Sequence, residues 1–372
     1  MSNLYKPIKL GPLELSHRIV LAPLTRYRAT DDHVPLPTVK EYYGQRASIP
    51  GTLLITEATY IAAKAGGDSN VPGIWNDAQI AAWKEVTDTV HAKGSYIFLQ
   101  LWALGRAADP KELRKENPDF PYVSASNIRM KGASLSGAVD EDPKPLTLDE
   151  IKEYVALYGQ AATNAVHKAG FDGVEIHGAN GYLPDQFLQD VSNDRTDAYG
   201  GSIENRARFA LEITDACVKA VGADRVGYRV SPWSAFQDMR MEEPIPTFAY
   251  LATQLKERYP DFGYFHAVEP RVNGNVNREA ADHENIQFLR DIWAPKVFIS
   301  AGGFHKENAE ALADAADNNI IAFGRQFLAN PDIHRKLVEN LPVTKYDRDT
   351  FYLRGDNTGR GYTDYPVADE LV

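Results

Sequence analysis

The chain has 372 residues, of which 44% are hydrophobic and 24% are charged, a composition typical of a globular protein with a large core. Its formal net charge of −11 argues against nucleic acid as the main partner and against a basic membrane-binding surface, because both need an excess of positive charge. The single cysteine, Cys217, excludes an intramolecular disulfide framework and a metal site built from several cysteines. No apolar run approaches 18 residues, and residues 1–11 lack the apolar stretch of a signal peptide. We therefore expect a cytoplasmic protein that binds neither nucleic acid nor membranes.

Short apolar runs alternate with amphipathic stretches along most of the chain. The apolar runs are rich in β-branched and aromatic residues and lack period-2 alternation, which is typical of strands buried on both faces. They lie at residues 18–24, 52–60, 96–101, 173–177, 226–230, 264–268, 296–301 and 320–323. Helical patterns lie at residues 77–91, 147–168, 202–221, 248–258, 284–292 and 306–315.

This alternation predicts the fold class. Strand–helix repetition over such a length indicates a parallel sheet, and eight units favour closure into a barrel. We therefore expect an α/β protein with a single (β/α)8 TIM-barrel domain over residues 1–372. Two segments fall outside the repeat. Residues 103–144 are polar and proline-rich, which predicts an extended loop or lid after the third strand, and residues 346–372 form an aromatic, glycine-rich tail.

Several common catalytic and binding motifs are absent from the sequence. It has no glycine-rich dinucleotide fingerprint after a strand, no Walker loop, no nucleophile elbow and no zinc-protease motif. The nine histidines are scattered without metal-ligand spacing, so we expect no metal site.

The strongest local signal is the end of the strand at residues 173–177, which is followed by Gly-Ala-Asn-Gly-Tyr. In a barrel the carboxyl ends of the strands face the active site. If the chain turned helically after the strand, His177 and Asn180 would share a face, and two such donors can stabilise a carbonyl oxygen that gains negative charge. Tyr182 adds an acid suited to protonating a carbanion-like carbon. The alternative is structural: His177 ends a strand, Asn180 makes a turn and Tyr182 packs in the wall.

A second signal lies at the ends of the last two strand candidates. Gly302 and Gly303 precede a helix, and Gly324 and Arg325 follow the final strand. In barrels these loops often bind phosphate through backbone N–H groups, and arginine supplies a planar charged fork. The alternative is a pair of tight turns with a solvated arginine.

A third group consists of single polar residues in or after apolar strands: Thr25, Gln100 and Arg229. Burying a glutamine or an arginine costs free energy unless it is paired. A flat heterocycle with donors and acceptors along its edge could pair with both, although each could instead bond within the barrel.

Together these residues resemble the Old Yellow Enzyme family of FMN-dependent ene-reductases, in particular its fungal and yeast-like branch. The resemblance runs from about residue 4 to residue 366, with the motifs in the order of the family. These are LAPLTR at 21–26, EYY at 41–43, GTLLITEA at 51–58, QLW at 100–102, HGANGY at 177–182, DQFL at 185–188, YGGSIENR at 199–206, GGF at 302–304, AFGR at 322–325 and DTFY at 349–352.

The resemblance implies a role for each matching residue. Those that would contact the non-covalent FMN are Pro23, Thr25, Ala58, Gln100 and Arg229 at the flavin ring and Gly302, Gly303, Gly324 and Arg325 at the phosphate. Ala58 departs from the glycine of many members. His177 and Asn180 would bind the substrate carbonyl, Trp102 and Tyr352 would shape the pocket, and Tyr182 would give the proton.

The resemblance also implies the reaction. A hydride from NADPH would pass through FMN to the β-carbon of an α,β-unsaturated aldehyde, ketone or nitroalkene, with a proton from Tyr182. Arg229 would stabilise the anionic reduced flavin, and Thr25 would tune its potential. Two alternatives stay open: a pathway-specific reductase of a secondary metabolite such as an ergot-alkaloid aldehyde, and a non-catalytic flavin-binding barrel. The partner is a small molecule in either enzyme, and the sequence leaves a homodimer open.

Overall fold

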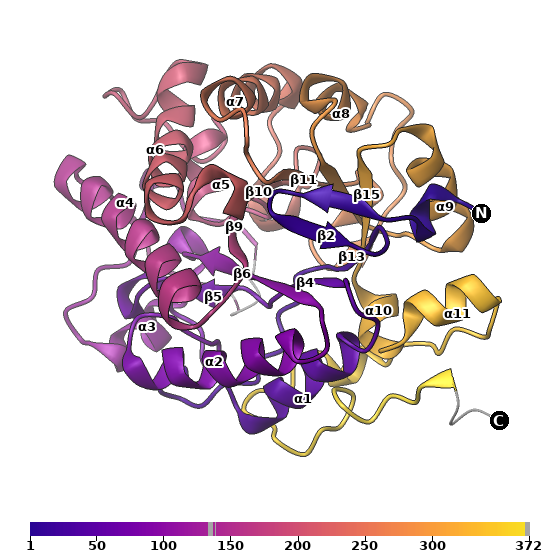
Figure 1. The fold of residues 1–372 in the computed structure, drawn as a ribbon. Helices are drawn as coiled ribbons and strands as arrows, with labels where there is room; N and C mark the ends of the chain where they lie inside the picture. The colour runs from indigo at the N-terminus through magenta and orange to yellow at the C-terminus, as the bar shows by residue number, and fades with distance from the viewer. Residues whose placement is uncertain (133–136, 138, 369–372) are drawn as a thin grey trace.

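The computed structural model describes residues 1–132, 137 and 139–368. Its centre is a closed barrel of eight parallel strands, as the sequence predicted (Figure 1). In barrel order these strands are β3 (Ile19–Leu21), β4 (Leu53–Ile55), β6 (Tyr96–Trp102), β9 (Gly173–His177), β10 (Val226–Val230), β11 (Tyr264–Val268), β14 (Phe298–Ala301) and β15 (Asn319–Phe323). Strand β15 pairs with β3 and closes the ring.

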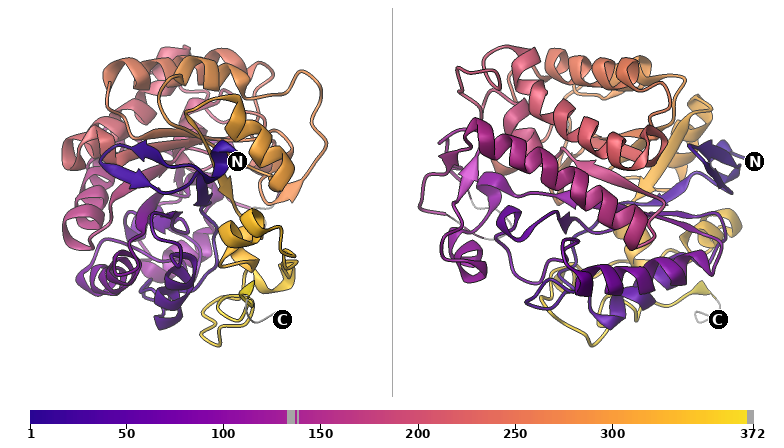
Figure 2. Two further views of the ribbon diagram at one scale, coloured as in Figure 1. Left: turned by 45° about the vertical axis from the view of Figure 1, so that its right-hand side comes forward. Right: turned by 60° about the vertical axis from the view of Figure 1, so that its left-hand side comes forward.

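Helices surround the barrel on all sides that the two further views show (Figure 2). They are α1 (Pro37–Arg46), α2 (Asp77–His91), α3 (Pro110–Glu116), α4 (Leu148–Thr163), α5 (Leu183–Leu188), α6 (Ile203–Val221), α7 (Pro244–Arg258), α8 (Gln287–Trp293), α9 (Lys306–Ala315), α10 (Arg325–Ala329) and α11 (Ile333–Glu339). The remaining strands are β1 (Ile8–Leu10), β2 (Leu13–Leu15), β5 (Thr59–Tyr60), β7 (Val123–Ser124), β8 (Lys144–Pro145), β12 (Val272–Asn273) and β13 (Val276–Asn277).

The helix boundaries follow local sequence signals. Helices α2 and α9 have the predicted bounds. Helix α4 begins after a capping box, in which Thr147 accepts from the backbone N–H of Glu150 and the Glu150 carboxylate accepts from that of Thr147. Helix α7 begins earlier than predicted, at Pro244. Proline suits the first turn of a helix, because the N–H group that it lacks would have no partner within the helix there.

The amino-terminal end of the barrel is closed by the antiparallel hairpin of β1 and β2. Its leucines, Leu10, Leu13 and Leu15, are buried against side chains that point into the barrel, among them Phe98 and Ile320. This apolar plug leaves the carboxyl ends of the strands as the open end.

The insertion after the third barrel strand is present, but it is not one irregular loop. It contains α3 and the pair β7–β8, and Arg106 within it donates to the backbone oxygens of Ile128 and Gln237. None of its described residues borders the main cavity of the barrel. The loop after β11 and the tail, by contrast, contribute residues to the lining of this cavity.

The C-terminal tail packs beside α1, as the colours of Figure 1 show. Tyr362 stacks on Tyr42 with ring centroids 4.1 Å apart and an angle of 4° between the rings. Arg26 donates to the backbone oxygens of Phe351 and Gly361, and Arg46 to those of Leu328 and Tyr362. Hydrogen bonds from the buried Arg26 and Arg46 thus hold the tail at the open end of the barrel.

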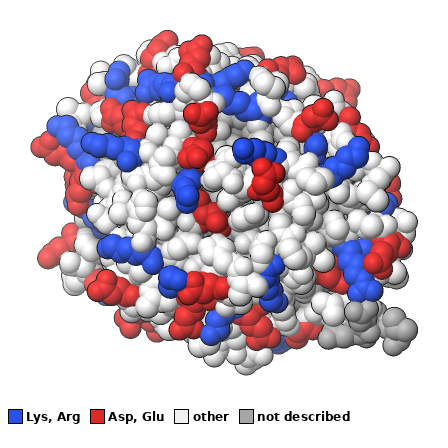
Figure 3. Space-filling view, in the orientation of Figure 1, with Lys and Arg blue, Asp and Glu red and all other residues white. Residues whose placement is uncertain are grey.

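The face shown in Figure 3 carries interspersed acidic and basic side chains. Over the described part of the chain, no helix combines the length and the apolar character that crossing a bilayer requires.

Candidate functional site

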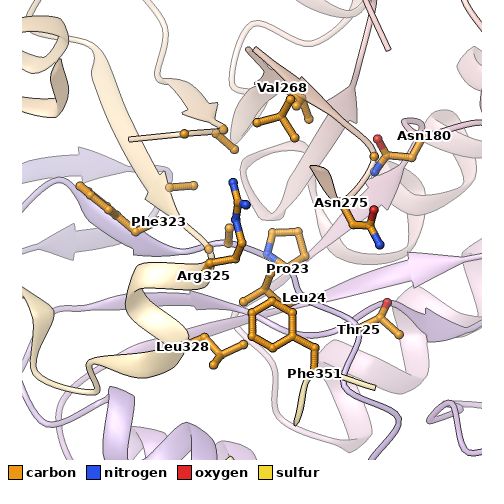
Figure 4. Close-up of a pocket in the computed structure, with 18 of the residues that line it drawn as sticks. Pro23, Leu24, Thr25, Asn180, Val268, Asn275, Phe323, Arg325, Leu328 and Phe351 are labelled. Atoms are coloured by element: carbon orange, nitrogen blue, oxygen red, sulfur yellow. The ribbon is translucent and has the colours of Figure 1, made fainter. Parts of the chain in front are cut away.

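A cavity of about 370 Å³ opens at the carboxyl ends of the barrel strands, a size typical of small-molecule sites (Figure 4). It brings together twelve of the residues that the sequence singled out. They are Pro23, Thr25, Gln100, His177, Asn180, Tyr182, Arg229, Gly302, Gly303, Gly324, Arg325 and Tyr352. The loop after β11 contributes Val272 and Asn275, and the tail contributes Tyr346 and Phe351.

Two of the expected site residues do not border the cavity. Ala58 and Trp102 are buried, but neither lines the cavity. The Trp102 ring contacts Tyr182 edge to face at 4.8 Å and lies nearly parallel to His177 at 6.3 Å. Trp102 therefore supports these two side chains from behind.

A tight turn, and not the helix considered from the sequence, places Asn180. Helix α5 begins only at Leu183, and Asn180 has a left-handed backbone with φ of 58°. The Asp185 carboxylate accepts from the backbone N–H of Gly181 at 2.8 Å, and the Ser231 hydroxyl accepts from that of Asn180 at 2.8 Å. These contacts fix the turn, and the buried side-chain oxygen Oδ1 of Asn180 has no hydrogen-bond partner among the described residues.

The surroundings make His177 a neutral hydrogen-bond donor. Burial lowers the pKa of His177 well below its usual value, and the nearby Arg229 and His266 lower it further. The backbone N–H of Ala179 points at Nδ1 of His177 at 3.4 Å. Since Nδ1 then accepts, Nε2 carries the proton and can donate to a carbonyl oxygen.

Tyr182 is held as a protonated phenol. Burial raises the pKa of Tyr182 well above its usual value, and Tyr352 and Asp68 raise it further. The Tyr182 ring meets the His177 ring at 4.8 Å and 67°. Gln237 donates to the backbone oxygen of Asn180 at 2.6 Å and also contacts the Tyr182 side chain. One wall of the cavity therefore carries His177, a hydrogen-bond donor for a carbonyl oxygen, and Tyr182, an acid.

Below the cavity, buried polar side chains from four adjacent strands form a chain of hydrogen bonds. Gln100 on β6 donates to Oε1 of Glu175 on β9 at 2.7 Å. Oε2 of Glu175 lies 2.8 Å from Nδ1 of His266 on β11. Nε of Arg229 on β10 donates to Nε2 of His266 at 3.5 Å. We refer to these four residues as the polar layer.

The sequence reasoning found two members of the polar layer and missed Glu175 and His266. Both are fully buried and stand in apolar strands, so the criterion that identified Gln100 and Arg229 applied to them as well. Hydrogen bonding within the barrel, the alternative that the sequence left open for Gln100 and Arg229, is present for both side chains. It satisfies only Nε of Arg229, whose two terminal nitrogens make no hydrogen bond with the described residues.

Two glycines and Arg325 line another part of the cavity. Gly302 and Gly303 have φ values of 113° and 63°, which favour glycine. Arg325 lines this side, but its guanidinium also donates to Asn277 and lies 3.3 Å from the hydroxyl of Tyr346. Arg325 is therefore already oriented toward the cavity by the loop after β11 and by the tail.

Comparisons with known proteins agree with this geometry. Residues 3–344 match the model of the NADH:flavin oxidoreductase / NADH oxidase family. A protein named chanoclavine-I aldehyde reductase from Penicillium roqueforti is 52% identical over 100% of this chain and 98% of its own length. A protein named probable inactive dehydrogenase from Claviceps fusiformis is 48% identical, over 100% and 96%.

Among solved structures, the Old Yellow Enzyme from Pichia sp. AKU4542 is 40% identical and has a TM-score of 0.88 over 99% of this chain and 94% of that one. The match to the family covers more than half of the chain and agrees with the resemblance drawn from the motifs. The chain therefore belongs to the NADH:flavin oxidoreductase / NADH oxidase family and is a flavin-dependent oxidoreductase of the Old Yellow Enzyme type.

Proposed function

We propose that this protein is an NADPH-dependent ene-reductase, which reduces the C=C bond of α,β-unsaturated aldehydes, ketones or nitroalkenes and holds FMN without a covalent bond. The observation that carries the proposal is the wall of His177, Asn180 and Tyr182, where two hydrogen-bond donors and a protonated phenol share one cavity. Reduction of a conjugated carbonyl compound needs hydrogen-bond donors for the oxygen, which gains charge, and an acid for the α-carbon, which takes a proton.

The residues present fit FMN. The two terminal nitrogens of Arg229 have no partner among the described residues and suit an electron-rich heterocycle edge, with Gln100 and Thr25 lining the same cavity. Gly302, Gly303 and Arg325 line the same cavity, and backbone N–H groups of glycine beside an arginine suit a phosphate. When bound, FMN supplies reversible hydride transfer. The only cysteine, Cys217, is buried on α6, so it offers no site for covalent attachment.

The chain's own residues divide the remaining work. Nε2 of His177 and the side-chain amide of Asn180 would hold the substrate oxygen and stabilise the charge that develops on it. Tyr182 would protonate the α-carbon, and its high pKa keeps the proton in place until a strongly basic carbon is present. Trp102 and Asp185 act as supports, the first behind both rings and the second beneath the turn.

A second candidate is a reductase dedicated to one aldehyde of a secondary-metabolite pathway. The name of the Penicillium roqueforti relative, chanoclavine-I aldehyde reductase, favours it. The name of the Claviceps fusiformis relative makes a non-catalytic flavin-binding barrel the third. The presence of His177, Asn180 and Tyr182 together in the cavity favours the two catalytic candidates over the non-catalytic barrel.

The test begins with the purified protein reconstituted with FMN. Heat denaturation should release the yellow chromophore into solution, and NADPH oxidation should accelerate with cyclohex-2-enone, a nitroalkene or a conjugated aldehyde but not with their saturated analogues. Acceleration by one pathway aldehyde alone would favour the second candidate. A protein that retains FMN and shows no acceleration by any of these substrates would contradict both enzyme proposals.

A further inference from the structure

The polar layer contains a hydrogen-bonded carboxylate and imidazole that do not line the cavity. Glu175 and His266 are fully buried, and the cavity-lining residues include neither of them, whereas their partners Gln100 and Arg229 reach the cavity. Burying a carboxylate costs several kcal/mol unless it is compensated. Its presence one layer below the site therefore calls for an explanation beyond packing, because a barrel interior is normally filled by branched apolar side chains.

The strand register brings the polar layer together. Gln100 stands opposite Glu175, and Arg229 stands opposite both His177 and His266. Since side chains alternate along a strand, Glu175 and His177 both point into the barrel, with His177 in the layer nearer the cavity. The register thus places Arg229 and His266 level with His177, and Gln100 and Glu175 one inward-facing position below them.

The hydrogen bonds define the proton positions in this layer. Arg229 donates through Nε to Nε2 of His266, so Nε2 accepts and Nδ1 carries the proton that points at Glu175. Burial lowers the pKa of His266, which keeps the ring neutral. Burial alone would raise the pKa of Glu175, but His266, Arg229 and Gln100 outweigh it, so the pKa of Glu175 lies below its usual value. Tyr264, the other titratable group beside Glu175, has its pKa raised by burial and stays neutral.

We propose that Glu175 and His266 are positioning residues that set the charge Arg229 presents to the cofactor, with neutral His266 linking the guanidinium to the carboxylate. The link holds Nε of Arg229 inward, which directs its two terminal nitrogens toward the cavity. The carboxylate offsets part of the cationic charge and limits how strongly the site favours the reduced, more negative form of FMN over the oxidised form. This inference rests on the proposed binding of FMN.

The substitution Glu175→Gln tests the charge with little change of shape. A glutamine can still meet Gln100 and His266, but the site gains one unit of positive charge. We expect the ratio of the dissociation constants of oxidised and reduced FMN to rise tenfold or more. For a two-electron couple, tenfold corresponds to a midpoint potential about 30 mV more positive. The readouts are the potential of the bound flavin and the affinity of the apoprotein for FMN.

Two variants separate charge from shape. Glu175→Asp keeps the charge and should leave the potential close to that of the wild type. Asp172 lies just before the same strand, at the end away from the cavity, where its carboxylate accepts from the backbone N–H of Ile97 and contacts His91. Asp172→Asn removes this carboxylate and should leave the flavin potential unchanged.

If Glu175→Gln does not fold, His266→Leu serves instead. It should shift the potential in the same direction, because the carboxylate loses a donor that keeps it ionised. An unchanged or lower potential in a folded, FMN-bound Glu175→Gln or His266→Leu protein would overturn the inference. Failure of the wild-type protein to bind FMN would instead overturn the proposed function.

Discussion

At the scale of single residues, burial sets the protonation of His177 and Tyr182, the two rings on the cavity wall. It keeps His177 neutral and able to donate, and it keeps Tyr182 protonated. Tyr352, which also borders the cavity, is 36% exposed and donates no side-chain hydrogen bond in the described structure. It offers a matched tyrosine for comparison with Tyr182.

The first prediction concerns the proton. Tyr182→Phe should leave reduction of the flavin by NADPH unchanged and slow its reoxidation by cyclohex-2-enone by about 100- to 10,000-fold, the usual contribution of general acid catalysis. Stopped-flow absorbance of the two half-reactions measures both. Tyr352→Phe should change reoxidation far less. If Tyr182→Phe slowed flavin reduction and spared reoxidation, Tyr182 would not be the proton donor.

The second prediction concerns the oxygen site. His177→Ala or Asn180→Ala removes one of two donors and should slow enone reduction by about 100- to 1000-fold, while oxidation of NADPH by oxygen stays measurable. Phenols, bound as anions by the same donors, should bind the FMN-loaded wild type with a long-wavelength absorption band. Titration of each variant with phenol should show a weakened band. Wild-type titration curves in both variants would mean that the site is misplaced.

The third prediction separates the two cavity arginines. Arg229→Ala should impair flavin reduction even at saturating FMN, since Arg229 faces the cavity from the polar layer. Arg325→Ala should act on FMN affinity through the phosphate, so excess FMN should restore its activity. Steady-state rates over a range of added FMN distinguish the two. Equal rescue of both variants would refute this division.

Secondary-structure elements explain which site residues the sequence could and could not predict. Thr25, Gln100, Arg229 and the glycines were found because strand ends meet at one end of a barrel. Glu175 and His266 could have been identified by the cost of burying a polar side chain in an apolar strand, but their pairing could not, because it depends on the register of neighbouring strands. The contribution of the loop after β11 was missed for a similar reason, since only the closed barrel shows which loops line the cavity.

The fourth prediction belongs to the elements around α5. The Gln186 side chain accepts from the backbone N–H of Arg106 and the hydroxyl of Ser124, and donates to the backbone oxygens of Leu104 and Gly181. It therefore joins the insertion to the turn that carries Asn180. Gln186→Ala should lower the free energy of unfolding by about 2–4 kcal/mol, because several buried polar groups lose partners. Urea denaturation measures the change.

Gln287 on α8 provides the control for this experiment. Its side chain is exposed and, among the described residues, bonds only to Arg290 and Asp291 of its own helix, so Gln287→Ala should change stability by less than about 0.5 kcal/mol. Equal effects of the two substitutions would show that Gln186 does not join these elements.

At the scale of the whole molecule, the end of the barrel away from the cavity contributes a dependence of stability on pH. His17 is buried, stacks on His334 at 4.3 Å, and accepts the backbone N–H of Ile19 through Nδ1. Its Nε2 lies 2.9 Å from the hydroxyl of Thr52, which itself donates to the Ile49 oxygen. Burial, followed by His334, lowers the pKa of His17 to about 3.

The fifth prediction follows from this shift. Between pH 6.5 and pH 3 the unfolded chain binds a proton at His17 that the folded protein does not, so stability falls as pH falls through this range. From pH 7.5 to pH 5, the wild type should lose about 2 kcal/mol more than His17→Gln. Urea midpoints at the two pH values measure the difference, and parallel losses would contradict the assignment.

The most direct measurement follows the hydrogen that NADPH supplies. The FMN-loaded protein is given NADPH deuterated at the transferable position and a conjugated aldehyde such as hex-2-enal, and the product is analysed by NMR and mass spectrometry. The proposed function predicts a saturated aldehyde with deuterium on the β-carbon, because the site holds the carbonyl oxygen and protonates the α-carbon. An allylic alcohol with deuterium on the carbonyl carbon would contradict it.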